Sequence, residues 1–589
     1  MAAAVSAPPI LGKTSFGSQD EETKTLGSEL GEGLSPPFND WPNDAGFDGA
    51  DDRRSPTELS VTGRIPVYAS GTLYRTGPGG YQVQTQQGIT LSASHWFDGF
   101  SQVHRFQIVP LENSKSQTKV FYNSRTTVDK LVEQIRSRGE ITKDFSFAQK
   151  RDPCQSYFKK VMSTFQSLST IARGPVAADK DTVNVGVTLS PNFPGLDSAK
   201  GQQDGHASGL QTLWAKTDSS VMKELDPETL EPVGLAYQES LHPDLTGPLS
   251  SAHAKSDPLT GDVFNYNLEL GRRSTYRFFR VSASTGETDV LATITDAEPA
   301  YLHSFFLSEN YVILCVWNSY FTMGGLKVLW EMNIMDSLAP FDSKKNVKWF
   351  VVDRKHGKGV VATYESPPFY CFHTINAYEE PSPTDPGEVD IVADLTVYEN
   401  LDVLKKFYYE NFKSTATDAP KYAGHKAASC RGNLNRWRLP NIHRSPPGAG
   451  PHEAKLVWSA PKDSSPELPT INPLQLTRPH RFVYGTNDRG LSTLVDGLVK
   501  VDGETQQVLH WGQHAHTPGE PIFVPDPEGK QEDDGVVLSV VLDGMKGQSY
   551  LLCLDARTMR EMGRAEVGSA VGFGFHGVHV PKTGWAVAI

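Results

Sequence analysis

A two-strand pattern that recurs along the chain is the feature that most limits its fold. In each copy an apolar segment with strand character leads into a turn that begins with Asp or Ser, and a second such segment follows. The turns begin at Asp226, Ser282, Asp353, Asp502 and Asp555, and the larger gap before Asp502 has room for a further copy. Recurring supersecondary units of this kind are typical of propeller blades. The pattern predicts an all-β chain, although antiparallel hairpins look alike in other β proteins too.

The length of the chain sets how many blades are expected. Residues 1–58 are rich in Gly, Pro, Ser and acidic residues and show no sustained periodicity, which predicts a disordered N-terminal tail. Radial repetition allows a propeller to grow beyond the usual size of one domain. The remaining residues, 59–589, have room for seven blades with their loops.

Composition excludes several other classes. The chain has 69 Asp and Glu against 56 Lys and Arg, a net charge of −13 without a long basic block, so no nucleic-acid partner is expected. Its five cysteines are far apart, which predicts neither a thiolate zinc site nor a disulfide framework. The N-terminus lacks a basic segment followed by an apolar run, and no apolar run approaches eighteen residues. We expect a cytoplasmic, reducing location.

Four histidines follow four of the turns at similar distances. The pairs, with their separations in residues, are Ser282 and His303 (21), Asp353 and His373 (20), Asp555 and His576 (21), and Asp226 and His253 (27). In a propeller, the segment after a blade's outer hairpin crosses to the inner strand of the next blade. Because inner strands surround the axis, residues at equivalent offsets converge there. The four histidines are therefore predicted to meet on the axis.

This set of side chains indicates a metal site. One histidine among apolar residues is more often a core residue than a ligand, but four at repeat-related positions favour ligands. Four imidazoles without a thiolate suit Fe, Cu, Zn or Ni. A ligating imidazole usually donates its other N–H to a carboxylate or carbonyl. Glu467 in SPELPTIN and Glu520 in PGEPIFV are candidate carboxylates, and each is also explained as an ordinary turn acid.

Several motifs resemble the carotenoid cleavage oxygenase family across nearly all of residues 59–589. The matching segments are GRIPVYASGTLYRTGP, HWFDGFSQVHRFQI, SSAHAKSDP, YLHSFFLSENYVI, FHTINAYEE, FHGVH, SPELPTIN, GEPIFVPDPEGKQEDDGVVLSVV and LDARTMREMGRAEV. The resemblance implies a seven-bladed β-propeller with a dome of loops and short helices over an axial metal site. It also implies that Fe²⁺ is the cofactor and that His253, His303, His373 and His576 bind it.

In this family, three glutamates hydrogen-bond three of the metal histidines. Glu467 and Glu520 occupy two of the corresponding motifs, and Asp218 in AKTDSSVMKELDPETL stands where the third is expected. Aspartate is one methylene shorter than glutamate. We therefore expect the bond from Asp218 to its histidine to be longer, mediated by water, or absent.

The resemblance further implies an iron(II)-dependent dioxygenase that uses O₂ to cleave a conjugated C=C bond of a carotenoid into apocarotenoid aldehydes. No catalytic side chain is expected beyond the metal site. A tunnel rich in Phe, Tyr and Trp is expected to hold the polyene, but the sequence does not identify which of the 28 Phe line it. The motifs look most like animal β-carotene oxygenases and fungal torulene- or carotene-cleaving enzymes, and the acidic tail favours the fungal group. A stilbene-cleaving dioxygenase of the same fold is one alternative, although its Tyr and Lys pair cannot be placed here. A retinyl ester isomerase and a non-catalytic carotenoid-binding propeller are others.

A lipophilic polyene resides in membranes, so a membrane-facing segment is expected. The stretch DPCQSYFKKVMSTFQSLST places Phe158, Val161, Met162 and Phe165 at helical spacing, and it resembles the membrane-facing segment of the animal retinoid isomerases. Cys154 is a candidate for lipidation. The alternative is an amphipathic helix packed on the core. The sequence predicts a peripheral association with membranes or lipid bodies, and it predicts neither the cleaved bond nor the oligomeric state.

Overall fold

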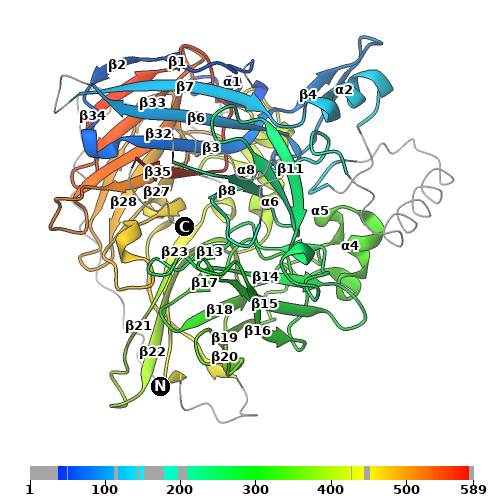
Figure 1. Ribbon diagram of the computed structural model, residues 1–589, viewed down its shortest axis with the longest axis vertical. Helices are drawn as coiled ribbons and strands as arrows, with labels where there is room; N and C mark the ends of the chain where they lie inside the picture. Colours follow the sequence, from blue (N-terminus) through cyan, green and yellow to red (C-terminus); the bar gives the residue numbers. More distant parts are fainter. Residues whose placement is uncertain are drawn as a thin grey trace.

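The computed structural model describes residues 38–49, 51–111, 117–141, 146–150, 178–196, 209–425, 427–442 and 451–582. Its sheets are arranged radially around a central axis, as Figure 1 shows. The expected disordered tail ended at residue 58, but the described residues before that point are packed. Trp41 is buried and its indole donates to Oγ1 of Thr517 at 3.2 Å, and the ring of Phe47 lies 4.4 Å from that of Phe412. These two aromatic side chains supply apolar surface that the polar composition of the segment hides.

The described strands form seven blades, as predicted, and we number the blades along the chain. Blade 1 contains β1 (Thr57–Glu58), β3 (Gly71–Gly80), β6 (Phe100–Pro110), β7 (Thr118–Thr126) and β35 (His576–Pro581). Blade 2 contains β8 (Thr188–Pro191), β9 (Leu213–Lys216), β10 (Val221–Leu225) and β11 (Pro232–Tyr237). Blade 3 contains β12 (Leu249–Ser250), β13 (Lys255–Ser256), β14 (Val263–Glu269), β15 (Thr275–Val281) and β16 (Thr288–Ile294).

The remaining blades continue in chain order. Blade 4 contains β17 (Phe306–Leu307), β18 (Tyr311–Val316), β19 (Val347–Asp353), β20 (Val360–Ser366) and β24 (His452–Glu453). Blade 5 contains β21 (Tyr370–Pro381), β22 (Val389–Tyr398), β23 (Asn433–Leu439) and β25 (Lys455–Ser459). Blade 6 contains β26 (Glu467–Thr470), β27 (Phe482–Asn487), β28 (Gly497–Asp502) and β29 (Val508–Trp511). Blade 7 contains β2 (Ser60–Gly63), β30 (His516–Pro518), β31 (Ile522–Pro525), β32 (Gly535–Asp543), β33 (Gln548–Asp555) and β34 (Glu561–Glu566).

The two ends of the chain close the ring of blades. The C-terminal strand β35 pairs with the N-terminal strand β3, so that His576 lies opposite Thr76. The strand β2 pairs with β34 at the outer edge of blade 7. This double pairing leaves blades 1 and 7 built from both ends of the chain, which protects strand edges that would otherwise stay open.

The repeated turns are the outer hairpins of the blades, as the pattern predicts. Oδ1 of Asp226 accepts from the backbone N–H groups of Glu228 and Thr229, and Oδ1 of Asp502 accepts from those of Glu504 and Thr505. An aspartate at the start of a turn satisfies backbone donors in this way. The copy that fits the larger gap is the hairpin between β23 and β25, whose turn carries no aspartate at its start.

Short helices lie over one face of the ring, as the family resemblance implied. They are α1 (Ala45–Asp48), α2 (Asp129–Arg138), α4 (Leu326–Glu331), α5 (Ile334–Ser337), α6 (Asp402–Lys406), α7 (Tyr409–Phe412) and α8 (Ala419–Tyr422). The helix α2 lies in the loop that joins blades 1 and 2, whereas α5 and α6 lie in loops that join paired strands of blade 4 and of blade 5. All three helices contribute residues to one cavity. A two-stranded ribbon of β4 (Gln82–Gln84) and β5 (Thr90–Ser92) projects beside α2. Among the described residues, no helix combines the length and hydropathy needed to cross a membrane.

Aromatic residues pack neighbouring blades together. The rings of Phe306 and Trp349 stack at 5.9 Å within blade 4, and Trp349 contacts Trp437 of blade 5 with ring centroids 6.2 Å apart. Both tryptophans are buried. Burying side chains of this size stabilises the fold by roughly 1.5–3 kcal/mol each, and it holds the inner strands at fixed positions around the axis.

Candidate metal centre

Four histidine side chains meet on the axis of the propeller. His253 lies between β12 and β13, His303 lies just before β17, His373 lies within β21, and His576 begins β35. All four are buried, and one nitrogen from each lies within 4.8 Å of the others. The similar offsets in the sequence therefore do place these residues at one point, because each offset leads from an outer hairpin to the inner edge of the following blade.

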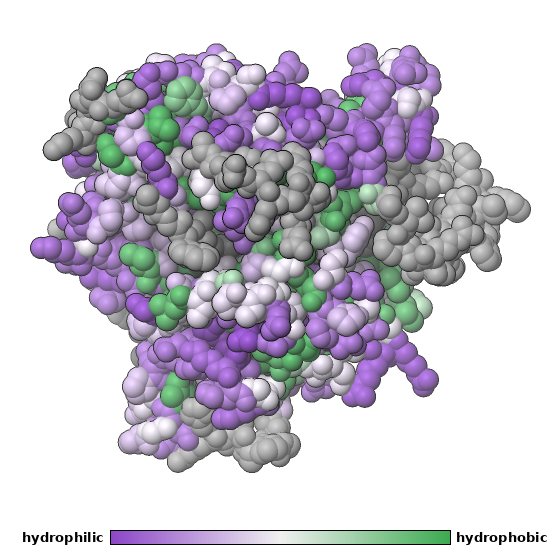
Figure 2. Space-filling view, in the orientation of Figure 1, coloured by the Kyte–Doolittle hydropathy of each residue, from purple (hydrophilic) through white to green (hydrophobic). Residues whose placement is uncertain are grey.

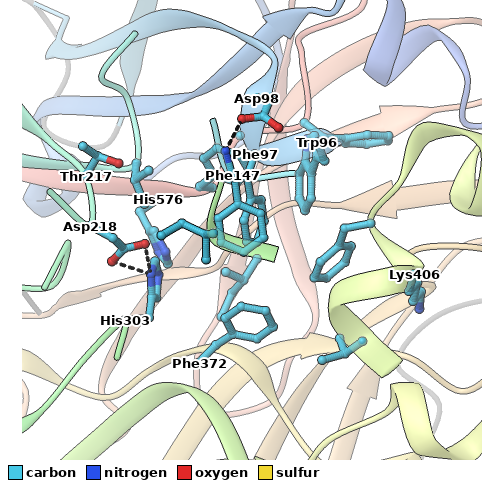
Figure 3. A pocket seen from close by; sticks show the side chains of 18 of the residues that line it. Trp96, Phe97, Asp98, Phe147, Thr217, Asp218, His303, Phe372, Lys406 and His576 are labelled. Carbon is cyan, nitrogen blue, oxygen red and sulfur yellow. Dashed lines mark hydrogen bonds and ion pairs between the residues drawn. The ribbon is translucent and has the colours of Figure 1, made fainter. Parts of the chain in front are cut away.

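The Nδ1 atom of His303 contacts Asp218, the aspartate that stands where the family has a third glutamate. Both carboxylate oxygens of Asp218 lie 2.9 Å from this atom (Figure 3). The expectation of a longer, water-mediated or absent bond is wrong. Asp218 is fixed by two further contacts: Tyr301 donates its hydroxyl to Oδ2 at 2.9 Å, and the backbone N–H of Ala252 donates to Oδ1 at 3.1 Å. The loop between β9 and β10 brings the shorter side chain within direct reach.

The two glutamates contact two other histidines. Oε1 of Glu467 lies 3.2 Å from Nδ1 of His373, and it also accepts the hydroxyl of Tyr398 at 2.9 Å. Oε1 of Glu520 lies 2.7 Å from Nδ1 of His576. Three carboxylates therefore orient three of the imidazoles. Among the described residues, no carboxylate forms a hydrogen bond or ion pair with His253, the fourth histidine.

Glu520 is also held by a buried cation that sequence analysis missed. Arg75 in β3 pairs with Oε2 of Glu520, and the backbone N–H of Gly577 donates to the same oxygen at 2.8 Å. Arg75 is 3% exposed. Burial raises the pKa of Glu520 to about 7, although Arg75 and the amide of Gly577 act in the opposite direction. The sequence signal that could have identified Arg75 is the presence of one charged residue in the otherwise uncharged strand segment GTLYRTG.

The donor set fits a metal cation. Because Nδ1 of His373 and of His576 each donate a proton to a carboxylate, their Nε2 atoms carry lone pairs, and these atoms lie 3.2 Å apart. The Nε2 atoms of His253 and His576 are 3.1 Å apart. Burial, followed by the other histidines, lowers the pKa of His253 and of His576 well below its usual range, which keeps the rings neutral. Neutral nitrogens this close repel one another unless a cation lies between them.

An aromatic cavity of about 560 Å³ opens beside the four histidines. Figure 3 shows Phe147 and Phe372 between the metal centre and the side of the cavity formed by Trp96 and Lys406. Its aromatic lining residues are Trp96, Phe97, Phe100, Phe147, Tyr301, Phe372, Tyr398, Phe407, Phe573 and Phe575. The expectation of an aromatic tunnel named none of these residues, because they come from loops of several blades that only the folded chain brings together.

Besides Asp218 and Glu467, five charged side chains line this cavity, and each has a partner: they are Asp98, Lys406, Arg431, Lys462 and Asp488. Asp98 accepts the backbone N–H groups of Phe147 and Ala148 at 2.6 and 2.8 Å, and burial raises its pKa to about 6. The ammonium of Lys406 donates to Oδ2 of Asp488 at 2.8 Å. Asp98 therefore anchors an aromatic segment of the wall, and Lys406 is neutralised by its neighbour.

The residues predicted to face a membrane lie outside the described part of the chain. They are Cys154, Phe158, Val161, Met162 and Phe165. The other four cysteines are free and buried. Two further histidines, His95 and His104, are buried away from this centre. A ring nitrogen of His95 lies 2.9 Å from the carbonyl oxygen of Leu404, and one of His104 lies 2.9 Å from the hydroxyl of Tyr122.

Comparison with known proteins gives consistent matches. The family model described as "Retinal pigment epithelial membrane protein" matches residues 46–581. A carotenoid dioxygenase of Neurospora crassa is 42% identical over 97% of this chain and 96% of its own length, and a torulene dioxygenase of Gibberella fujikuroi is 41% identical over 98% of this chain and 100% of its own. A variant of the Synechocystis apocarotenoid oxygenase superposes with a TM-score of 0.68, with 21% identity over 92% of this chain and 99% of that one, which supports the fold.

Proposed function

This chain belongs to the family of the retinal pigment epithelial membrane protein and the carotenoid oxygenases, and we propose that it is an iron(II)-dependent dioxygenase that cleaves a torulene- or carotene-like polyene into apocarotenoid aldehydes. One observation carries the proposal beyond family membership. The four-histidine centre opens directly into a long aromatic cavity, as His303, His373 and His576 line that cavity together with its aromatic residues.

The side chains around the centre bind and orient rather than react. His253, His303, His373 and His576 would hold the iron, and Asp218, Glu467 and Glu520 fix three of the rings through Nδ1. When bound, ferrous iron supplies the redox chemistry by which O₂ cleaves an electron-rich double bond. The remaining task of the protein is to hold one double bond of the polyene beside the centre and to keep water away.

The cavity suits an apolar polyene better than a phenol. Aromatic rings reach the metal centre, since Phe372 lines the cavity and its ring lies 6.0 Å from that of His303. A stilbene phenol requires a free polar anchor, whereas Lys406 is already bound to Asp488 and Asp98 is bound to two backbone amides. The charged groups of the cavity therefore favour the carotenoid over the stilbene alternative.

A peripheral contact with membranes or lipid bodies is part of the proposal. Three hydrophobic side chains on one short segment of the dome are exposed: Met323 at 73%, Leu326 at 44% and Trp330 at 62%. They belong to α4 and the turn before it, and Figure 2 shows hydrophobic surface in this part of the molecule. The adjacent helix α5 contributes Ile334 to the aromatic cavity, so this surface lies near a wall of the substrate site. Loss of liposome binding in Trp330→Glu, with Trp458→Glu as a control, tests the contact.

The deciding experiment is aerobic incubation of the iron-loaded protein with detergent-dispersed torulene, β-carotene and resveratrol, with products identified by chromatography and mass. We expect aldehydes from a carotenoid, with masses that give the cleaved bond, and no products from His303→Ala. Cleavage of resveratrol alone would show that the substrate is a stilbene rather than a carotenoid. Full activity of His303→Ala would overturn the four-histidine centre. Carotenoid binding without products would favour the non-catalytic alternative.

A further inference from the structure

A second cavity, of about 500 Å³, lies at the opposite end of the axis from the aromatic cavity. The C-terminal strand shows the arrangement: residues 573–575 line the aromatic cavity, and residues 577–579, which follow His576, line the second one. The segment from β30 to β31 within blade 7 shows the same arrangement, since Pro518 lines the first cavity and Ile522 lines the second. His373 and His576 line both cavities, and His253 lines the second, so the four-histidine centre lies between the two spaces.

Two buried lysines face the axial cavity without partners. Lys216 at the end of β9 is 3% exposed, and Lys255 at the start of β13 is 8% exposed. Neither ammonium forms a hydrogen bond or ion pair with any residue that the structure describes. Two buried lysines without an acidic partner leave their donor groups unsatisfied, and an anion between them would supply hydrogen-bond acceptors and the opposite charge.

The acidic residue that lines this cavity does not supply the missing charge. Glu520 is bound to Arg75 and to His576 on its two oxygens. Arg478 adds a further cation to the lining. The charged groups of the cavity are therefore in positive excess, which favours a negatively charged ligand.

The outer part of the cavity is apolar. Leu259 and Leu474 line it and are 75% and 62% exposed, so they form a hydrophobic rim where the cavity reaches the surface. The lining also includes many aliphatic, aromatic and proline side chains, among them Leu189, Pro469, Ile522, Phe523, Val524 and Val578. An inorganic anion would leave this surface without a partner.

We propose that the axial cavity binds an amphiphilic carboxylate, with its head group between Lys216 and Lys255 and its hydrocarbon chain extending toward Leu259 and Leu474. Fatty acids and carotenoid-derived acids share this chemistry. His253, His373 and His576 line the same cavity, but the proposed head-group contacts are made by Lys216 and Lys255 and not by these metal ligands. Failure of one proposal therefore leaves the other standing.

Calorimetric titration of the iron-loaded protein tests the head-group contact. Laurate should bind at a ratio of one to one and at least tenfold more tightly than either dodecanol or acetate. Lys216→Met should weaken laurate binding at least tenfold, and the double variant with Lys255→Met should weaken it further. Lys223→Met is the matched control, because Lys223 is equally buried in the neighbouring strand but donates to the carbonyl of Thr127 at 2.9 Å. Unchanged laurate binding in the double variant, or equal binding of dodecanol, would overturn the proposal.

A second variant tests the apolar rim without altering a buried residue. Leu259→Glu should repel the ligand and weaken laurate binding, whereas Leu456→Glu, which changes an exposed leucine that does not line the cavity, should leave it unchanged. If both variants bind laurate as the unmodified protein does, the ligand lies elsewhere and the assignment fails. Repeating the titration with retinoate distinguishes the sources: tighter binding of laurate indicates a fatty acid, and tighter binding of retinoate indicates a carotenoid-derived acid.

Discussion

Both carboxylate oxygens of Asp218 lie 2.9 Å from Nδ1 of His303, so an aspartate occupies the orienting position for which the family resemblance implied a glutamate. We expect Asp218→Ala to reduce metal affinity about 10–100-fold, because His303 would lose the contact that fixes its tautomer and ring orientation. Competition between the protein and a chelator for Fe²⁺ under anaerobic conditions measures this affinity. Asp296→Ala, at an exposed acidic residue, is the control. Equal metal affinity in Asp218→Ala would show that the bond does not support the site.

The pair of Arg75 and Glu520 supports a second histidine, and it is buried on both sides. Arg75→Met should lower the free energy of unfolding by about 3–5 kcal/mol, since it leaves the carboxylate of Glu520 without its buried cation. Urea denaturation measures the change. Arg54→Met removes a pair with Asp129 in which both side chains are about half exposed, and it should cost less than about 1 kcal/mol. Similar losses in the two variants would mean that burial of Arg75 has no special effect.

Asp98 gives the protein a specific dependence on pH. Burial raises its pKa from 3.8 to about 6, so between these values the folded chain holds a proton that the unfolded chain has lost. The contribution of Asp98 to stability is therefore fully present below pH 3.8 and falls as the pH rises to about 6, by about 3 kcal/mol in total. Asp98→Asn cannot titrate. Urea denaturation at pH 4, 5, 6 and 7 should show unmodified protein losing stability relative to Asp98→Asn, and a constant difference would contradict the shift.

Much of the architecture could be predicted because blades repeat. The turn aspartates, such as Asp226 and Asp502, recur for a local reason, the capping of backbone donors, and the offset from these turns to the axial histidines follows from the connection between blades. The turn between β23 and β25 lacks this aspartate, so sequence inspection left a gap there. The ordered segment around Trp41 was missed because its partner, Thr517, is 476 residues away.

The residues of the candidate site could likewise be predicted where they lie in local motifs, and not where their contacts depend on the tertiary fold. The histidines and the two glutamates lie in recognisable local motifs, whereas the contact between Asp218 and His303 depends on where the β9–β10 loop ends, which no local pattern reports. Arg75 was missed because its partner lies 445 residues later in the chain. The aromatic cavity was expected as a class, but its residues could not be identified, since they come from loops whose packing is set by tertiary contacts.

Phe372 tests whether the aromatic wall positions the polyene. It is buried, it lines the cavity, and its ring lies 6.0 Å from that of His303 and 6.0 Å from that of Phe407. Phe372→Leu keeps an apolar side chain but removes the flat surface beside the centre, so the substrate double bond would be held less firmly. We expect kcat/KM for the cleaved carotenoid to fall about 10–100-fold. Iron content should remain unchanged, because no metal ligand is altered.

The matched control for Phe372→Leu is Phe306→Leu, at a buried phenylalanine that stacks on Trp349 and does not line the aromatic cavity. Both variants should lose comparable stability, since each removes a similar amount of buried aromatic surface. Steady-state rates on carotenoid substrate, together with product masses, separate the two effects. A larger fall in kcat/KM for Phe306→Leu than for Phe372→Leu would mean that the loss reflects weakened packing of the blades rather than lost contact with the substrate. An altered product mass in Phe372→Leu alone would show directly that this ring helps to select the bond that is cleaved.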